Sequence, residues 1–347
     1  DDIPKQVHII SCGSLFRCLG TSQKECSHNL GRYFLRGVFA VICKLFGRKA
    51  VMPLLLRSQK KLTTHYDCAI SYLQNGDPHH FYGGVNEFVL HKVDAERKIA
   101  FLHCDYMQCG ANCEANNADY KKFDLIAACS DGCRDSFIRA LPELSKKCRT
   151  VPNFHRYSEI RTLAQKSPYI YDPESLHIVM VGRLAHEKGI DRALHAVDHA
   201  RKQGIPAILH LVGDGPTGAA LRSLACELGL EDAVKFHGQQ NNPYRFMTYA
   251  DLLLITSWHE AAPMVIDEAY ALSLPVLTVE TTSSEEMVAK RGCGWVCKNE
   301  QSAIDAALTS VLKNTEDLRE MKERCLHSAH DNKNARSAFA ELLREEL

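Results

Sequence analysis

Four charged residues in the second half of the chain have the types and spacing that could bind a phosphorylated sugar. Arg183 and Lys188 lie in the segment GRLAHEKG, while Glu260 and Glu268 lie eight residues apart in SWHEAAPMVIDEA. Arginine suits bidentate contact with a phosphate, and lysine supplies a mobile point charge. Two carboxylates could accept hydrogen bonds from several hydroxyl groups of a sugar and a ribose. The same residues also suit a plainer interpretation, in which Glu260 stabilises a helix start and the others lie on a solvated surface.

These segments follow apolar runs that have the pattern of β-strands. From residue 177 onward, such runs alternate with amphipathic stretches of helical length, which is typical of a parallel, doubly wound sheet. The first half repeats the theme around YDCAISYL, RKIAFLH, FDLIAACS and CRTVPN. We therefore predict an α/β protein with two Rossmann-like domains that face a cleft. Ligands of open α/β sheets bind beyond the carboxyl ends of the strands, where the charged segments fall.

The expected domains span residues 1–168 and 169–325, followed by a C-terminal helix at 326–347. The polar, proline-containing stretch RTLAQKSPYIYDPESL suits a linker between the two domains. The opening DDIPKQVHII has the pattern of a turn followed by a strand. In VGRLAHEKG and VGDGP, the glycines Gly182, Gly213 and Gly215 would let the backbone approach a ligand closely, although VGDGP alone also suits a tight turn.

Composition indicates an ordinary globular protein. The 347 residues are 45% hydrophobic and 24% charged, and no apolar run reaches the length of about 18 residues that a membrane-spanning helix needs. Fifteen cysteines, scattered through strand and helix patterns, favour reduced thiols and a cytoplasmic protein. The cluster His103, Cys104, Cys109 and Cys113 lacks the paired spacing of common zinc sites, so we interpret it as loop and core thiols and expect no metal.

The formal net charge of zero hides an uneven distribution. Residues 1–65 contain eleven basic and three acidic residues, a charge of +8 that the remaining residues balance. Over residues 32–61, apolar clusters alternate with Arg32, Arg36, Arg48 and Lys49 at helical spacing. A helix pair with a solvated basic face accounts for this pattern. The other interpretation is a patch for an anionic membrane surface or a phosphorylated lipid. We expect no nucleic-acid partner.

Taken in order, the motifs resemble the C-terminal domain of retaining glycosyltransferases of the GT4 family (glycosyl transferases group 1), which have the GT-B fold. The stretch from His177 to about residue 313 carries a G-R-L-x-x-E-K-G element, a G-x-G-P turn and an E-x7-E element. The resemblance implies that Arg183 and Lys188 hold the donor diphosphate. It also implies that Glu260 approaches the donor sugar and that Glu268 holds the nucleotide ribose.

The resemblance assigns further residues and a chemistry. It implies that backbone near Gln239, in HGQQ, faces the base, and that His103, which ends ERKIAFLH, reaches the donor sugar. The implied donor is a UDP- or GDP-sugar, used without a metal or other cofactor. The implied acceptor is a hydroxyl of a lipid-linked or polysaccharide glycan, as in capsule or lipopolysaccharide assembly. The expected location is the cytoplasm, with peripheral attachment to the inner face of a membrane as a hypothesis. The full expected donor-binding set is Gly182, Arg183, Lys188, Gly213, Gly215, Gln239, Glu260 and Glu268.

One departure leaves other functions open. Members of the family open with a strand, a Gly-rich loop and a helix that this sequence lacks, so we expect a partial first domain. The alternatives are a nucleotide-sugar epimerase, a glycoside hydrolase and a non-catalytic subunit that binds nucleotide sugar. The epimerase would need a further acid/base set that the sequence does not reveal. The hydrolase would use two carboxylates but would have no need for Arg183 and Lys188.

Overall fold

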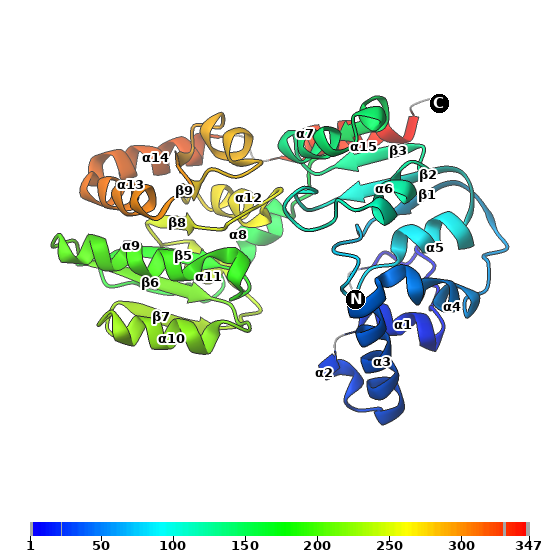
Figure 1. Ribbon diagram of the computed structural model, residues 1–347. Coiled ribbons are helices and arrows are strands. Elements are labelled where there is room, and N and C mark those ends of the chain that lie inside the picture. The colour runs from blue at the N-terminus through cyan, green and yellow to red at the C-terminus, as the bar shows by residue number, and fades with distance from the viewer. Residues whose placement is uncertain (1–2, 22, 329–330, 345–347) are drawn as a thin grey trace. The chain divides into compact units, whose positions relative to one another are not determined.

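The chain folds into two compact α/β units, each built on a parallel sheet (Figure 1). The structure is a computed structural model that describes residues 3–21, 23–328 and 331–344. Of these, the first unit holds the residues up to Cys129, Arg134–Thr150 and those from Ala340 onward. The second unit holds Ser130–Cys133 and Val151–Phe339. The predicted α/β class is confirmed, while the predicted domain limits stay predictions.

The second unit contains a six-stranded sheet in the order β10-β9-β8-β5-β6-β7. The chain adds β6 and β7 on one side of β5 and then returns to add β8 on the other side. Loops after β5 and β8 therefore leave neighbouring strands at a topological switch point, where doubly wound proteins bind ligands. The strands are β5 (Leu176–Val181), β6 (Ala207–Val212), β7 (Val234–Gly238), β8 (Leu252–Ile255), β9 (Val276–Val279) and β10 (Gly294–Cys297).

Helices cover both faces of this sheet because successive strand residues point to opposite sides. Ile178 of β5 packs with α9, α10 and α13, whereas its neighbour Val179 packs with α11 and α12. Such burial on both faces accounts for the continuous apolar runs in the sequence. The helices are α8 (Tyr157–Gln165), α9 (Ile190–Lys202), α10 (Gly218–Glu227), α11 (Tyr244–Met247), α12 (Met264–Ala271), α13 (Gln301–Lys313) and α14 (Thr315–His327), with a π-helical turn at Glu285–Ala289.

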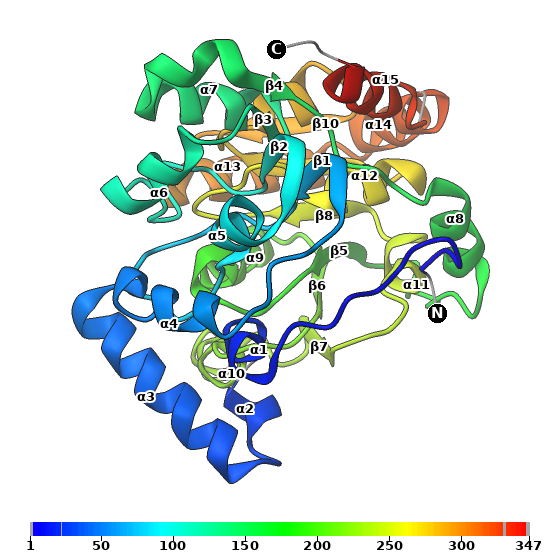
Figure 2. The same cartoon turned by 90° about the vertical axis from the view of Figure 1, so that its right-hand side faces the viewer.

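The first unit contains a four-stranded parallel sheet in the order β1-β2-β3-β4. Its amino-terminal helices form a separate apolar cluster around Phe16, Phe39 and Leu55. Both ribbon views show α3 extending away from the sheet of this unit (Figures 1 and 2). The strands are β1 (His65–Ser71), β2 (Asp94–Leu102), β3 (Leu125–Ala128) and β4 (Cys148–Thr150). The helices are α1 (Ser14–Gly20), α2 (Gln23–Cys26), α3 (Leu30–Phe46), α4 (Met52–Arg57), α5 (Val85–Lys92), α6 (Glu114–Tyr120), α7 (Asp131–Ala140) and α15 (Lys333–Arg344), of which α7 and α15 cross between the units.

Two local predictions are wrong. Residues 3–13 form no strand, and Val7, Ile9 and Ile10 are exposed, because a strand needs a neighbouring strand to take its hydrogen bonds. The predicted linker begins inside a helix, since α8 continues to Gln165 and buries Ile160 against Ala271. Within the described residues, no helix is long and apolar enough to cross a membrane.

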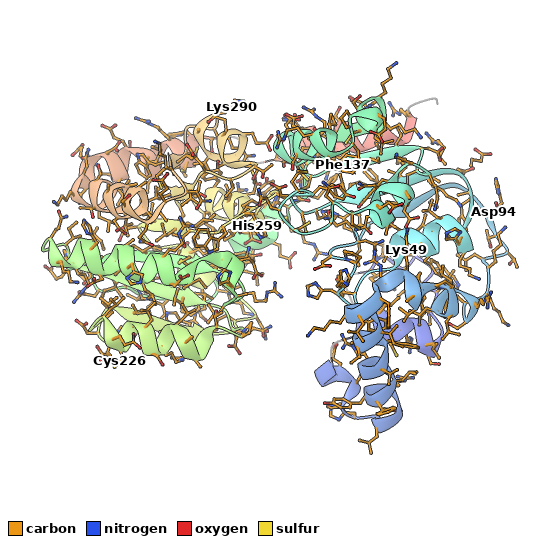
Figure 3. All side chains as sticks on the ribbon, viewed as in Figure 1. Lys49, Asp94, Phe137, Cys226, His259 and Lys290 are labelled. Carbon is orange, nitrogen blue, oxygen red and sulfur yellow. The ribbon has the colours of Figure 1, made fainter. Side chains whose placement is uncertain are left out.

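The predicted basic patch at residues 32–61 also needs a correction, because Arg48 is only 2% exposed. Its Nε atom lies 3.2 Å from Glu87 Oε1, and its Nη2 donates to Asn116 Oδ1 at 2.8 Å. Asn75 donates to the second oxygen of Glu87 at 2.8 Å. A buried guanidinium needs such partners, so Arg48 holds the first unit together and contributes nothing to a surface. Its neighbour Lys49 is exposed and is labelled in Figure 3.

We predict that Arg48→Met lowers the free energy of unfolding of the first unit by about 3–5 kcal/mol, because it leaves the Glu87 charge buried without its partner. Both tryptophans, Trp258 and Trp295, lie in the second unit, so their fluorescence reports that unit while far-UV circular dichroism reports both. In urea, the dichroism transition should begin earlier while the fluorescence midpoint stays in place. Lys49→Met is the matched control, and an equal effect of the two substitutions would contradict the prediction.

Candidate donor-nucleotide site

The predicted ligand-binding segments leave the carboxyl ends of four neighbouring strands in the second unit. Gly182 follows β5, Gly213 follows β6, Gln239 follows β7, and Glu260 lies in the loop after β8. Parallel strands end at one edge of a sheet, so these segments meet although they lie far apart in the sequence. A cavity of about 370 Å³ lies at this edge. Its lining is Val181, Gly182, Arg183, Val212, Gly213, Asp214, Gln239, Gln240 and Pro243.

Close backbone packing builds the wall of this cavity at Gly213. Its φ of 151° and the space around it both require glycine, because a Cβ there would lie 1.8 Å from the carbonyl oxygen of Gly182. The amide of Gly182 donates to the carbonyl of Val212 at 3.0 Å, and the amide of Leu184 donates to that of Asp214 at 3.0 Å. The loops after β5 and β6 therefore hold each other in place through backbone atoms alone.

The structure brings together Lys188 and Glu260, which are 72 residues apart. Lys188 Nζ donates to Glu260 Oε1 at 2.7 Å, and Ser257 Oγ donates to the same oxygen at 2.7 Å. The side chains of Lys188 and Glu260 are 33% and 12% exposed. Pro263 precedes α12, and no side chain caps that helix. Glu260 therefore makes no capping hydrogen bond to α12, and its partners are Lys188 and Ser257 instead.

A second glycine allows the Lys188 loop to lie against the β8 loop. Gly189 has a φ of 55°, and a Cβ there would lie 2.3 Å from the carbonyl oxygen of Thr256. Thr256 Oγ1 donates to the carbonyl of Gly189 at 2.7 Å. Residue 189 thus has to be glycine for the ion pair between Lys188 and Glu260 to form where it does.

The second predicted cation, Arg183, is mostly exposed and pairs with Glu187. Burial raises the pKa of Glu187, but hydrogen bonds from its own amide and from Arg183 outweigh burial and lower it. Arg183, Lys188, Ser257 and Glu260 line one pocket. Two cations and one carboxylate in a single pocket can bind a diphosphate and an adjacent sugar hydroxyl.

Glu268 lies in α12, where Tyr244 Oη donates to its Oε1 at 3.3 Å. Burial raises the pKa of this carboxyl group above its usual value, and the hydrogen bond from the Tyr244 hydroxyl offsets only part of that rise. A carboxylate that keeps an unused oxygen can accept further hydrogen bonds from hydroxyl groups. The roles predicted for the donor-binding residues stay predictions, although their positions at the strand ends match the expected arrangement.

Sequence analysis missed a buried carboxylate, Asp267, whose ion pairs anchor α12. Asp267 is 6% exposed and lies between Arg291 Nη1 at 2.6 Å and His155 Nε2 at 3.2 Å, with the Tyr157 hydroxyl at 3.3 Å. Burial raises the pKa of Asp267, but the His155 hydrogen bond and the Arg291 charge outweigh it and lower the pKa to about 2. Asp267 directly precedes Glu268, so the network holds the helix that carries a predicted ribose ligand. The tertiary fold, rather than any local motif, brings its members together.

His103 directly follows β2 in the first unit. Its ring lies 4.6 Å from that of Tyr72 and stacks on Phe101 at 5.8 Å. Gln74 Oε1 accepts from the amides of His103 and Cys104 at 2.7 and 2.9 Å. Burial lowers the His103 pKa, and the buried Nε2 atom has no hydrogen-bond partner among the described residues. A neutral imidazole with an unpaired nitrogen suits contact with a ligand hydroxyl, so the predicted role stays a prediction.

Cys104 and Cys109 lie near His103 in the sequence, in the cluster that we interpreted as loop and core thiols rather than as a metal site. A hydrogen bond from the Cys109 thiol to Cys104, together with burial, raises the pKa of Cys109, and Gln74 Nε2 lies 3.5 Å from its sulfur. Among residues 3–21, 23–328 and 331–344, no three His, Cys, Asp or Glu side chains are grouped as metal ligands would be.

Comparison with known proteins identifies the second unit. Residues 165–326 match the family described as glycosyl transferases group 1. A lipopolysaccharide core biosynthesis glycosyltransferase, LpsD of Rhizobium meliloti, is 30% identical over 170 residues, which cover 47% of this chain and 45% of LpsD. An amylovoran biosynthesis glycosyltransferase, AmsK of Erwinia amylovora, is 29% identical over 39% of this chain and 35% of AmsK. The match therefore spans less than half the length of these curated relatives.

Solved structures identify the fold of the larger part of the chain. WaaG, a glycosyltransferase involved in lipopolysaccharide biosynthesis, matches with a TM-score of 0.57 and 20% identity, over 75% of this chain and 80% of WaaG. HepE of Anabaena, in complex with UDP, matches with a TM-score of 0.59 and 20% identity, over 71% of this chain and 72% of HepE. The fold class is GT-B, as predicted. Residues 165–326, which match the glycosyl transferases group 1 family, all lie in the second unit.

We predict that Asp267→Asn lowers the free energy of unfolding of the second unit by about 2–3 kcal/mol, because the neutral amide loses the ion pairs that hold the pKa of the buried carboxyl roughly two units below its usual value. The pKa of Asp267 is lower in the folded than in the unfolded state. Its contribution is therefore complete above the unfolded pKa of about 4 and is lost as the pH falls through about 2.

Urea unfolding followed by tryptophan fluorescence measures this effect. Asp232→Asn is the control, since Asp232 forms an exposed ion pair with Arg201 at 2.9 Å and its loss should cost at most about 1 kcal/mol. If Asp232→Asn and Asp267→Asn shift the urea midpoint equally near neutral pH, Asp267 does not have the stabilising role predicted here.

Proposed function

We propose that this protein transfers a sugar from a UDP- or GDP-sugar to an acceptor hydroxyl, with retention of the anomeric configuration. The observation that carries the proposal is the ion pair between Lys188 and Glu260, at the strand ends of a group 1 glycosyltransferase domain. It joins a cation suited to a diphosphate with a carboxylate suited to a sugar hydroxyl. The relatives LpsD and AmsK are named glycosyltransferases, and the solved HepE structure contains UDP, which supports the same donor class.

Each residue has a defined part in the proposed reaction. The bond between the anomeric carbon and the diphosphate oxygen breaks, and its electron pair leaves with the diphosphate. The acceptor oxygen forms the new bond on the same face, and its proton passes to the departing phosphate oxygen. Lys188 and Arg183 stabilise the charge that develops on the diphosphate. Glu260 holds a sugar hydroxyl, Glu268 holds the ribose, and His103 is retained as a further contact to the donor sugar.

The proposed chemistry uses no metal or other cofactor. Arg183 and Lys188 supply two positive charges in one pocket, which can balance the two negative charges of a diphosphate ester. The backbone near Gln239 is the proposed contact for the base.

The exposed face of α3 supports a proposal about the acceptor and the location. Leu30, Phe34, Val41 and Leu45 are 57–82% exposed and follow the spacing of a single helical face. The opposite face of α3 buries Phe39 and Cys43 in the first unit, so this helix is apolar on both sides. A solvated basic face, the plainer expectation from the sequence, does not describe such a helix.

Cations flank the apolar face of α3. Arg32 and Lys44 of α3 are exposed, and Lys49 follows in the next turn. A cavity of about 690 Å³ lies beside the amino end of α3, lined by apolar and polar side chains together with Arg17, Arg32 and one acid, Glu25. Apolar side chains next to cations suit an amphiphile with an anionic head group. We therefore propose a lipid-linked glycan acceptor and peripheral attachment to the anionic, cytoplasmic face of a membrane.

Site variants test the donor assignment. Lys188→Ala should lower kcat by about a hundredfold or more, because it removes charge stabilisation in the transition state. Glu268→Gln should instead raise the dissociation constant of UDP or GDP by about tenfold, as expected from the loss of a charged hydrogen bond. Calorimetry measures the binding, and sugar release from labelled donors in the presence of lipid-linked acceptors measures kcat. Lys202→Ala is the control, because Lys202 is exposed in the last turn of α9, outside the residues assigned to the site.

The outcomes separate the alternative functions. Unchanged kinetics in both variants would refute the site. Donor binding by the native chain without turnover would support a non-catalytic subunit, and acceptor-independent conversion of the nucleotide sugar would support an epimerase.

Liposome flotation tests the membrane proposal. The triple variant Arg32→Ala, Lys44→Ala, Lys49→Ala should bind vesicles of anionic phospholipid about a hundredfold more weakly, at about 1 kcal/mol per cation. Val41→Asp should weaken binding to both anionic and neutral vesicles, since it places a charge in the apolar face. The control removes three exposed lysines of the second unit, Lys166, Lys290 and Lys313. Binding that falls equally in the control and the triple variant would contradict a specific face.

A further inference from the structure

Three histidines on adjacent strands of the second unit form a continuous hydrogen-bonded chain. His177 lies in β5, His210 in β6 and His237 in β7. His177 Nδ1 is 3.0 Å from His210 Nε2, and His210 Nδ1 is 3.0 Å from His237 Nε2. At the far end, His177 Nε2 is 2.7 Å from the carbonyl oxygen of Asp172. The chain crosses the same three strands whose carboxyl ends line the proposed nucleotide cavity.

The carbonyl at one end determines the direction of every bond in the chain. A carbonyl oxygen only accepts, so His177 Nε2 carries the hydrogen and His177 Nδ1 is left as an acceptor. His210 must then donate from Nε2 and accept at Nδ1. By the same reasoning, His237 donates from Nε2. All three neutral rings thus have their hydrogen on Nε2, and His237 Nδ1 is the end of the chain that can accept a proton.

A second proton on His210 or on His177 would break the chain. Protonated His210 would present an N–H group toward the N–H of His237, and protonated His177 would do the same toward His210. Burial, followed by the neighbouring His237 and His177, lowers the pKa of His210 to about 3. Only His237 can become charged while both hydrogen bonds of the chain remain intact.

His237 occupies a β-bulge. Phe236 pairs with Leu211 and Gly238 pairs with Val212, which makes His237 an extra residue in β7. Bulges redirect side chains and are frequent beside functional sites. Here the bulge places His237 among the rings of Phe246, at 4.3 Å, and Tyr169, at 5.3 Å.

The backbone after the bulge forms one wall of the cavity. The carbonyl of His237 accepts from Gln240 Nε2 at 2.7 Å, and the carbonyl of Gly238 accepts from the Gly213 amide at 2.9 Å. Gln239 and Gln240 then line the cavity. A movement of His237 is therefore transmitted directly to the residues proposed to face the base.

A charge on His237 would meet other cations. Arg245, from α11, lies 5.3 Å from the Phe246 ring centre, and together with burial it lowers the pKa of His237. Lys235 lies two residues earlier on the same strand and lowers the pKa of His210. Two acids lie at the other end of the chain: Asp251 accepts from the His177 amide and pairs with Lys322, and the Asp172 carboxyl group interacts electrostatically with His177. The other titratable groups packed on the chain are the phenols of Tyr169 and Tyr171.

We propose that His177, His210 and His237 are positioning residues that hold the base-side wall of the donor cavity, and that proton uptake at His237 weakens donor binding. Repulsion from Arg245 then displaces the bulge and, through Gly238, the backbone next to Gln239. The proposal rests on the donor site described under the proposed function. It adds a pH dependence of donor binding that comes from His237, which is not one of the residues proposed to contact the donor.

The experiment measures the dissociation constant of the UDP- or GDP-sugar that binds most tightly at about pH 8, by calorimetry down to about pH 5.5. Sugar nucleotides are suitable probes because their diphosphate carries no proton that titrates in this range. In the native chain, the dissociation constant should rise toward the acid end of this range, by at most about tenfold per pH unit, as expected for one proton. In His237→Gln the rise should disappear, since the amide can still donate to His210 but takes up no proton.

The control is His199→Gln on α9, where His199 is exposed and bonds only to Gln203 among the described residues. It should keep the native pH profile. Parallel profiles of the native chain and His237→Gln would overturn the proposal. Nitrogen NMR of the three imidazoles gives an independent readout: a uniform Nε2–H form at about pH 8 supports the chain, and mixed forms overturn it. If no sugar nucleotide binds the native chain at about pH 8, the proposed donor function itself fails, and NMR still tests the chain.

Discussion

Backbone contact between the strand-end loops is the constraint on which the candidate site depends. Gly213 lies so close to Gly182, and Gly189 so close to Thr256, that any side chain at either glycine would collide with a carbonyl oxygen. These contacts tie the loops after β5, β6 and β8 together before any charged side chain takes part. The cations and carboxylates of the site are thereby held on rigid backbone, which is what a preorganised electrostatic site requires. The site therefore needs glycine at positions 213 and 189 as well as its charged side chains.

The charged groups fall into two kinds that differ in purpose rather than in burial, since the Glu87 and Glu260 side chains are both 12% exposed. Asp267 and Arg48 are themselves buried and act on stability, because either charge would be costly without its partner. The Lys188 side chain is 33% exposed, so Lys188 can exchange Glu260 for a ligand atom at modest cost. For Lys188 that atom would be a diphosphate oxygen, and Ser257 would keep its bond to Glu260. Neighbouring positions in α12 show both kinds, since Asp267 anchors the helix while Glu268 keeps an oxygen for a ligand.

In the first unit, some of the basic residues predicted to lie on the surface have partners inside the protein. Its basic residues do not form one uniform surface, because Arg48 is internal and Arg36 donates to the carbonyl of Thr21. What α3 presents outward is an apolar face with cations at its borders. A helix that is apolar all round is normally covered on every side, so this exposed face calls for a partner.

The order of the strands and helices, the α/β class and the positions of Arg183, Lys188, Glu260 and Glu268 at strand ends could be predicted from the sequence alone. Each depends on local periodicity or on motifs within a few residues. Tertiary structure decided which distant residues meet: Lys188 with Glu260, Asp267 with Arg291 and His155, and the three histidines of β5, β6 and β7. It also decided that Arg48 is buried and that residues 3–13 form no strand. Periodicity records which face of an element is apolar, but the element that covers that face comes from elsewhere in the chain, and only the folded structure identifies it.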